Sequence, residues 1–129
     1  MNGNATICAA IAALALSAGP VGAQDMGDAD AGEAVFRKCK ACHVVEEAKN
    51  RVGPTLNGVI GRTPGTVEDY NYSNAMQEFG QDHVWDDATL TEYLAAPRDV
   101  VKGTKMTFPG LKDEADIANV IAYLKQFSD

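Results

Sequence analysis

Two cysteines and a histidine lie within five residues of one another, in the order Cys39-Lys40-Ala41-Cys42-His43. Residues three apart share a face of a helical turn, so both thiols can point to the same side. A Cys-x-x-Cys-His sequence is the attachment signature of c-type haem. The two thiols would form thioethers with the porphyrin, and the imidazole of His43 would bind the iron as proximal ligand. The pattern therefore predicts one covalently attached haem c.

Two other chemistries use a similar pair of cysteines. A thioredoxin-like redox pair needs a strand, a turn and a helix around its Cys-x-x-Cys motif. A zinc site needs further ligands, yet no second cysteine pair follows, and His83 is the only other histidine. The third cysteine, Cys8, lies near the N-terminus and is not part of the motif. Haem attachment is the interpretation that we favour.

The N-terminal stretch has the composition of a secretory signal peptide. It carries no charged side chain before Asp25, and residues 7–16 are almost wholly Ala, Ile and Leu. Small residues follow and end with Ala23, as at a cleavage site. We therefore expect residues 1–23 to be a signal peptide, residues 24–129 to be one domain, and the protein to be periplasmic. An uncleaved anchor is the alternative, although the apolar run is short and interrupted for a membrane span.

The elements that position the cysteine motif are expected to be helices. One helix should run from about residue 31 to residue 42, with Asp30 and Glu33 as a capping box. Gly32 within it lowers helix propensity, which suggests a close approach by another backbone. The last helix, about residues 113–127, has the apolar spacing of an amphipathic helix at Ile117, Val120, Ile121 and Leu124.

Two further helices are expected between these. Ser73 can cap a short helix that ends near Gly80, and another helix should begin at Asp86 or Asp87 and stop before Pro97. Residues 44–65 and 98–110 contain repeated Gly and Pro and are expected to be irregular. No stretch alternates convincingly between polar and apolar residues, so we predict an all-α fold with helices packed around the haem.

A haem bound by His43 alone leaves one axial position of the iron open. The candidates for this position in residues 24–129 are Met26, Met76, Met106 and His83. Met106 lies in a loop flanked by Gly and Pro, but a loop methionine often only fills a gap. Met76 falls in a predicted helix, where core packing is the simpler role, and His83 should be exposed. The residues by themselves leave this choice open.

Further short motifs accompany the cysteine motif along the chain. They are Gly53-Pro54-Thr55-Leu56-Asn57-Gly58, Gly61-Arg62, Tyr70-Asn71-Tyr72-Ser73, Trp85, Glu92-Tyr93-Leu94, Gly103-Thr104-Lys105-Met106 and Ile121-Ala122-Tyr123-Leu124-Lys125. With them the sequence resembles the class I cytochromes c, close to the branch of mitochondrial cytochrome c and bacterial cytochrome c2. The resemblance covers nearly the whole chain after the leader. It implies the class I cytochrome c fold, with about four to five helices packed around one covalently attached haem.

The same resemblance implies roles for particular residues around the haem. Met106 would be the second axial ligand of the iron, together with His43. The carbonyl of Pro54 would accept a hydrogen bond from the His43 ring and fix its tautomer. Tyr93 would donate its hydroxyl to the Met106 sulfur, which is a weak acceptor. A buried haem propionate, whose charge is costly to bury alone, would be held by Arg62, Tyr72 and Trp85.

The resemblance also implies how the first and last helices meet. Gly32 and Phe36 would cross the last helix at Val120 and Tyr123, which explains a glycine inside a helix. Phe108 would cover the haem edge. The chain departs from the mitochondrial pattern at Met76, where the mitochondrial proteins have an asparagine near the haem.

Charge is distributed unevenly along a chain whose net charge is −7. Residues 37–62 carry six basic and two acidic residues, and residues 98–112 carry four basic residues and one acidic residue. Such segments can simply be solvated surface. They can equally form a basic rim around the haem edge that steers an acidic partner and makes association depend on salt. The residues that we expect in this rim are Lys38, Lys40, Lys102 and Lys105.

The resemblance implies a one-electron carrier rather than an enzyme. An iron with two protein ligands has no open position for dioxygen or peroxide, and Met/His ligation raises the reduction potential. Such a protein would transfer electrons, by outer-sphere transfer through the haem edge, from a quinol-oxidising membrane complex to a terminal oxidase, photosynthetic reaction centre or soluble reductase. We expect partners with acidic docking surfaces, no nucleic acid, no permanent membrane anchor and a monomer. The alternatives are a haem peroxidase or gas sensor and a small structural zinc domain.

Overall fold

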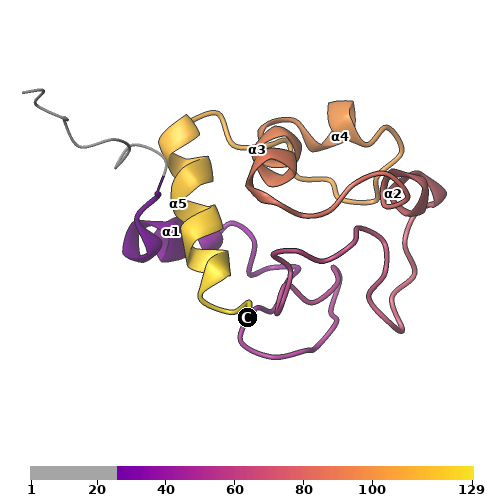
Figure 1. The fold of residues 1–129 in the computed structure, drawn as a ribbon, viewed down its shortest axis with the longest axis horizontal. Coiled ribbons are helices and arrows are strands. Elements are labelled where there is room, and N and C mark those ends of the chain that lie inside the picture. Colours follow the sequence, from indigo (N-terminus) through magenta and orange to yellow (C-terminus); the bar gives the residue numbers. More distant parts are fainter. Residues whose placement is uncertain (1–25) are drawn as a thin grey trace, which may run out of the picture.

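The computed structural model describes residues 26–129 (Figure 1). The predicted signal peptide, residues 1–23, lies outside the described residues. The described chain contains no strand and five helices, which are α1 (Ala29–Phe36), α2 (Asn74–Phe79), α3 (Asp87–Ala95), α4 (Pro97–Val100) and α5 (Glu114–Lys125). The predicted all-α fold is therefore confirmed. No helix between residues 26 and 129 is both long and apolar enough to cross a membrane.

Side-chain oxygens cap the start of each described helix except α4, because the first amides of a helix have no backbone partner. Ser73 Oγ accepts a hydrogen bond from Met76 N at 3.1 Å, at the start of α2. Asp86 Oδ1 accepts one from Thr89 N at 2.8 Å, at the start of α3. Both starts are as predicted. Asp113 caps α5 in the same way.

Helix α1 begins earlier than predicted. Its cap is Asp28, whose Oδ1 accepts hydrogen bonds from Asp30 N at 2.9 Å and Ala31 N at 3.1 Å. The predicted capping box of Asp30 and Glu33 is therefore wrong. The earlier carboxylate takes the free amides, so Asp30 lies inside the first turn, where a negative charge favours the helix dipole.

The predicted helix across the cysteine motif is replaced by tight turns. Helix α1 ends at Phe36, and turns occupy the residues up to Cys42. Cys39 N donates to Phe36 O at 2.8 Å, and His43 N donates to Cys39 O at 2.9 Å. The second of these bonds has the spacing of an α-helical turn. The motif thus keeps one helical turn although the regular helix has ended.

The region after α3 is also more ordered than predicted. Residues 98–110 were expected to be irregular, but the short helix α4 begins at Pro97 and includes Arg98. Proline suits the first position of a helix, because its φ is fixed near the helical value and its missing N–H has no partner there. The rest of this segment, from Val101 onward, has no helix until α5.

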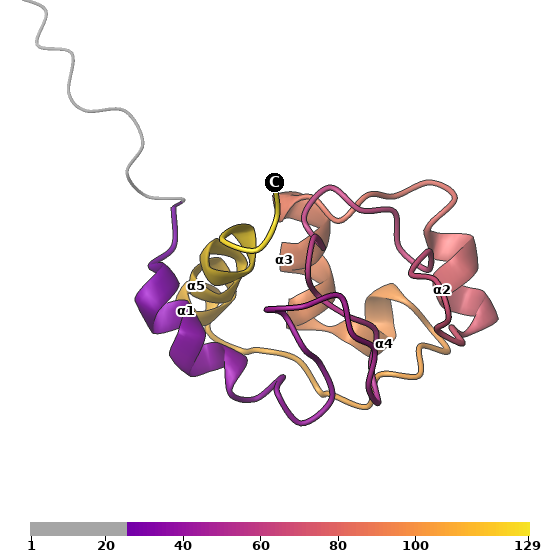
Figure 2. The same ribbon diagram turned by 90° about the horizontal axis from the view of Figure 1, so that it is seen from below.

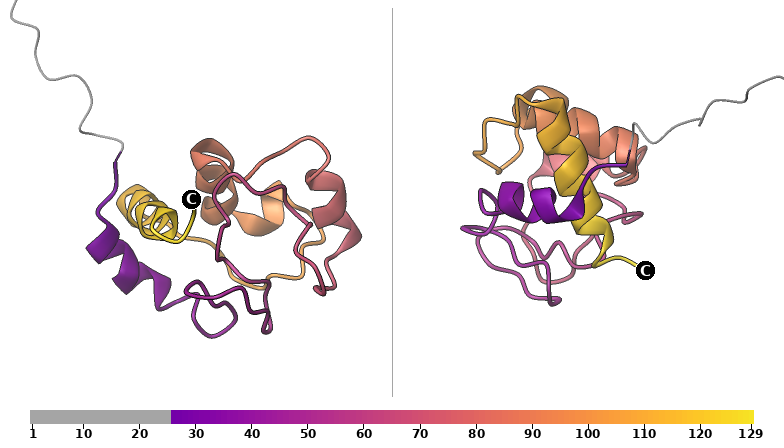
Figure 3. Two further views of the ribbon diagram at one scale, coloured as in Figure 1. Left: turned by 60° about the horizontal axis from the view of Figure 1, so that its bottom comes forward. Right: turned by 90° about the vertical axis from the view of Figure 1, so that its left-hand side faces the viewer.

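Helices α1 and α5 cross at one end of the molecule (Figure 3, right). A Cβ atom on Gly32 would overlap the backbone carbonyl of Asn119, so only glycine allows this approach. The rings of Phe36 and Tyr123 pack with centroids 5.3 Å apart, and Val120 is buried beside them. The predicted close approach at Gly32 is confirmed, as is the crossing at Val120 and Tyr123.

The other helices lie away from this crossing. Figure 2 shows α2 at the end opposite to α1 and α5, with α3 and α4 between. Residues 37–73 form one long, irregular connection from α1 to α2, and residues 101–113 connect α4 to α5. Both connections contribute walls to the cavity described next.

Candidate haem-binding site

A cavity of about 410 Å³ lies between the two long connections and helices α2 and α3. Its volume is in the range of ligand pockets, and its walls are mainly apolar. Nine residues predicted to contact a haem line it, namely Cys39, Cys42, His43, Pro54, Arg62, Tyr72, Trp85, Tyr93 and Met106. Phe108, expected at the haem edge, also lines it. Residues far apart in the chain are thus brought to one site.

The His43 imidazole is held with a defined tautomer. Its Nδ1 lies 2.7 Å from the carbonyl oxygen of Pro54. A carbonyl only accepts hydrogen bonds, so Nδ1 carries the proton. Burial lowers the pKa of His43 and favours the neutral ring. In this tautomer Nε2 has a free lone pair, as a metal ligand requires, and the hydrogen bond predicted with Pro54 is present.

Gly53 lets the neighbouring loop pack directly on this imidazole. A Cβ atom at this position would overlap the His43 ring. Gly53 N donates to Cys42 O at 2.8 Å, which fixes the loop against the cysteine motif. The sequence identifies Gly53 only as part of a motif. Its Gly-Pro signal indicates a turn, but no local pattern says which side chain the glycine faces.

Met106 lies beside two hydroxyl groups. Tyr93 Oη is 4.0 Å from Met106 Sδ, a long hydrogen bond to sulfur, and 3.2 Å from Thr104 Oγ1. Thr104 Oγ1 also accepts a hydrogen bond from Met106 N at 3.3 Å. Burial raises the pKa of Tyr93, so its hydroxyl keeps its proton. The predicted contact between Tyr93 and Met106 is present, and Thr104 is a further partner that the sequence did not indicate.

Arg62 is a partly buried cation with one unmet donor. Its Nη2 donates to Thr55 O at 2.9 Å, and its Nη1 donates to Asn57 O at 3.3 Å. Its Nε is buried and has no hydrogen-bond partner among residues 26–129. A buried donor without a partner is costly. A carboxylate in the cavity would satisfy it, and Tyr72 and Trp85 line the same cavity, so these residues fit a haem propionate.

The four candidates for the second axial ligand of the iron lie in different environments. Met76 and Met106 line the cavity, and Met76 is buried on α2, where core packing was predicted. Met26 is 85 % exposed. His83 is exposed, as expected, and its ring stacks on Phe79 with centroids 3.9 Å apart. Of the two methionines in the cavity, Met106 is the one whose sulfur lies near a hydroxyl in the described chain.

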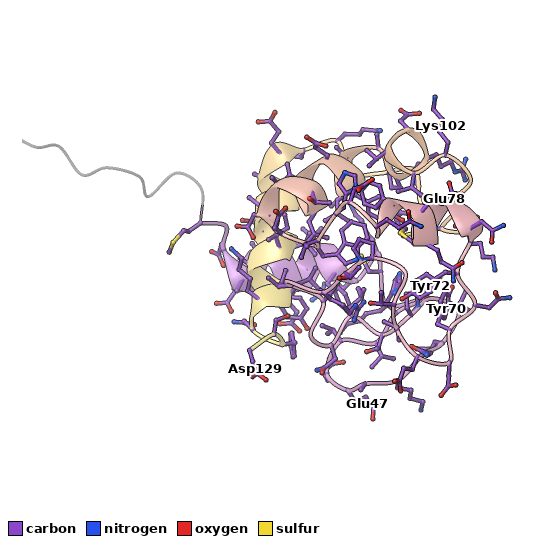
Figure 4. All side chains as sticks on the ribbon, turned by 45° about the vertical axis from the view of Figure 1, so that its right-hand side comes forward. Glu47, Tyr70, Tyr72, Glu78, Lys102 and Asp129 are labelled. Carbon is purple, nitrogen blue, oxygen red and sulfur yellow. The ribbon has the colours of Figure 1, made fainter. Side chains whose placement is uncertain are left out.

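Three hydrogen bonds join the loops around the cavity. They are Asn50 Nδ2 to Glu68 O at 3.0 Å, Tyr70 Oη to Val52 O at 2.8 Å, and Lys105 Nζ to Asn71 O at 2.7 Å. Figure 4 shows Tyr70 and Tyr72 side by side, and their rings meet edge to face, with centroids 4.7 Å apart. The loop that carries Met106 is therefore tied to the loop that carries both tyrosines.

The predicted rim lysines are all exposed, but they are not equivalent. Lys38 and Lys105 line the cavity, whereas Lys40 and Lys102 do not. Of these four lysines, Lys105 is the one whose amine donates a hydrogen bond to another residue of the described chain. Figure 4 shows Lys102 at the periphery of the molecule. The amines of Lys38, Lys40 and Lys102 can therefore bind a partner without losing a hydrogen bond to the described chain.

Comparison with known proteins agrees with this geometry. The sequence model of the family described as "Cytochrome c" matches residues 29–128. The chain belongs to the cytochrome c family. Cytochrome c2 of Rhodoblastus acidophilus is 55 % identical over 102 residues, which cover 78 % of this chain and 94 % of the relative. Cytochrome c-554 of Methylosinus trichosporium is 52 % identical over 120 residues, which cover 92 % of this chain and 88 % of the relative.

A solved structure supports the same assignment. Cytochrome c2 from Rhodospirillum centenum has a TM-score of 0.76 and 41 % identity, over 80 % of this chain and 100 % of that one. The predicted class I cytochrome c fold and the bacterial cytochrome c2 branch are confirmed. The protein carries covalently attached haem c, and it is an electron-transfer protein rather than an enzyme. The peroxidase and zinc-domain alternatives are thereby set aside.

Proposed function

We propose that the protein carries single electrons in the periplasm, from a quinol-oxidising membrane complex to a terminal oxidase, photosynthetic reaction centre or soluble reductase. The observation that carries the proposal is that neutral His43 and Met106, with its neighbouring hydroxyls, line one cavity. Haem c in this cavity supplies outer-sphere, one-electron transfer. Two protein ligands leave no position for dioxygen or peroxide, which suits a carrier.

In this proposal Cys39 and Cys42 attach the haem, and His43 Nε2 and Met106 Sδ bind its iron. Both cysteines line the cavity, and neither forms a disulfide. Arg62 would pair with a propionate through its unsatisfied Nε, which offsets the cost of burying both charges.

We propose that Lys105 ties the Met106 loop down, and the Lys105→Ala variant tests this. Its amine holds Asn71 O at 2.7 Å, across two loops that line the cavity. Loss of this bond should lower the free energy of unfolding of the holoprotein by about 1 kcal/mol, a modest value because solvent competes at an exposed site. Guanidinium titration followed by the fluorescence of Trp85, the only tryptophan, measures it.

The matched control for this prediction is Lys102→Ala. Lys102 precedes Met106 in the same loop, is exposed, and has no side-chain hydrogen bond within the described chain. Its removal should change the free energy of unfolding by less than about 0.5 kcal/mol. Equal unfolding curves for the two variants would show that the Lys105 hydrogen bond does not hold the loop.

The basic rim, Lys38, Lys40, Lys102 and Lys105, would dock the protein on acidic partner surfaces. The Lys38→Glu variant tests this, with a purified bacterial cytochrome c oxidase as the partner. Lys38 is exposed and lines the cavity, so the reversed charge should oppose an acidic partner where electrons leave. The second-order rate constant should fall roughly tenfold at low salt. The difference should disappear near about 0.5 M salt, where screening removes it.

Lys112→Glu is the control for the charge reversal. It changes the net charge by the same amount, but Lys112 does not line the cavity. Its rate constant should stay within about twofold of the wild type at every salt concentration. If both variants slow the reaction equally, only net charge matters and the proposed rim is not a docking surface.

A further inference from the structure

Asn57 is followed directly by Gly58, and this pair of residues can undergo a reaction of its own. The backbone nitrogen that follows an asparagine can attack the side-chain amide, and glycine hinders this attack least because it has no Cβ atom. Among residues 26–129, Asn57 is the asparagine that precedes a glycine. The pair lies in a turn in which Gly58 has a φ of 70°, and Gly58 is exposed, so water reaches it.

The reaction is deamidation, and it needs no cofactor. Gly58 N loses its proton and attacks the side-chain carbonyl carbon of Asn57, the bond from that carbon to Nδ2 breaks, and ammonia leaves. The product is a cyclic succinimide. Water then adds to either carbonyl carbon of the ring and opens it to aspartate or isoaspartate. The reaction consumes water and releases ammonia, and nothing is oxidised or reduced.

In the folded protein both reacting groups are held in hydrogen bonds. Gly58 N donates to Phe127 O at 2.8 Å, and Asn57 Nδ2 donates to Val45 O at 2.9 Å. Ring closure must break the first bond to free the nitrogen and the second bond to turn the side chain. The reactive conformation is therefore reached when this part of the structure opens locally.

The residues that follow α5 hold the loop of Asn57 in place. Phe127 supplies the carbonyl for Gly58, and Ser128 Oγ accepts a hydrogen bond from Ile60 N at 3.2 Å. The ring of Phe127 packs edge to face on Tyr123, with centroids 5.1 Å apart. Figure 1 shows the C-terminus beside the irregular connection between α1 and α2. Chain ends open more readily than a packed core, so this contact is where the loop can open.

We propose that Asn57 is a deamidation site that Phe127 and Ser128 keep closed, and that opening of their contact with the loop leads to irreversible conversion of Asn57. This inference does not depend on the proposed function. Conversion weakens the loop, because an aspartate would face Val45 O without a donor. Isoaspartate would also displace the carbonyl to which Arg62 Nη1 donates at 3.3 Å. The modification would thus remain as a record that the fold had opened.

The test follows Asn57 by mass spectrometry of residues 52–62, the peptide that trypsin releases by cleavage after Arg51 and Arg62. The holoprotein is incubated at mildly alkaline pH, in buffer and in guanidinium chloride that unfolds it. The unfolded protein should deamidate at least about tenfold faster, because local opening no longer limits the reaction. Equal rates would show that the fold does not protect Asn57. If Asn57 stays unmodified in the unfolded protein, it is not a deamidation site.

Ser128→Ala tests the role of the C-terminal residues under native conditions. Loss of the hydrogen bond from Ile60 should raise the deamidation rate of the holoprotein about fivefold, as expected for a contact weakened by one hydrogen bond. Gln126→Ala is the matched control, since Gln126 is exposed at the end of the same helix, and its rate should equal that of the wild type. If the two variants deamidate equally fast, the C-terminal residues do not protect Asn57 and the proposal is wrong.

Asn57→Asp reproduces one product of the reaction and tests its consequence. The holoprotein of this variant should unfold at a lower guanidinium concentration than the wild type, because the hydrogen bond to Val45 O is lost. Asn71→Asp makes the same change of charge at an exposed asparagine and should unfold as the wild type does. Equal unfolding midpoints for the two variants would show that conversion of Asn57 does not weaken the loop.

Discussion

Met106→Ala should convert the closed haem iron into one that binds carbon monoxide. The variant removes the thioether that we propose as second axial ligand and leaves its neighbours Tyr93 and Thr104 in place. The ferric protein should lose the weak near-infrared absorption of the iron–sulfur bond. Its midpoint potential should fall by on the order of 0.1–0.3 V, because methionine ligation raises the potential. Absorption spectra of the ferric and reduced forms, with and without carbon monoxide, measure these changes.

Met76→Leu and Met26→Ala are the controls for this experiment. Met76 lines the same cavity, and leucine keeps its volume without the sulfur. Met26 is 85 % exposed and outside the cavity. Both variants should keep the near-infrared band and exclude carbon monoxide. If Met76→Leu loses the band and Met106→Ala keeps it, then Met76 is the ligand.

Gly32→Ala should have the largest effect on stability. The added methyl group would overlap the Asn119 carbonyl in α5. The obstacle is backbone, so no side-chain rotation can relieve the overlap, and α1 must move away from α5. Separation of the helices would also weaken the contact of Phe36 with Tyr123. The free energy of unfolding of the holoprotein should fall by about 3 kcal/mol, as measured by guanidinium titration.

Glu33→Ala is the control for this prediction. Glu33 is the next residue of α1 and is exposed, so its truncation removes no helix contact. Its free energy of unfolding should lie within about 0.5 kcal/mol of the wild type, and alanine itself favours a helix. If Gly32→Ala is as stable as Glu33→Ala, then the two helices can separate at no cost and their close approach does not stabilise the fold.

Some features of the structure follow from short stretches of sequence. Cys39, Cys42 and His43 fall within one turn, so their spacing alone brings two thiols and an imidazole together. Ser73 and Asp86 begin helices where their side chains can reach free amides. Gly32, inside a predicted helix, already indicated a neighbouring backbone. Each of these inferences needs only the geometry of a turn or a helix.

Other local predictions failed because several residues competed for one role. Three acidic residues lie close together at the start of α1, and Asp28 rather than Asp30 caps the helix. Propensity alone does not say which carboxylate reaches the amides. Pro97 both ends α3 and begins α4, and a sequence pattern shows only the first of these effects.

The chemistry of the cofactor was determined by the sequence itself, because the attachment motif is contiguous and the further motifs resemble one family. Only the tertiary structure decided which residues contact one another across the cavity. Thr104 beside Tyr93 joins an irregular loop to α3, and Gly53 against His43 and Lys105 on Asn71 join segments without regular structure. Such loops have no period from which a facing residue can be calculated. Their contacts exist only once the loops and helices have closed around one cavity.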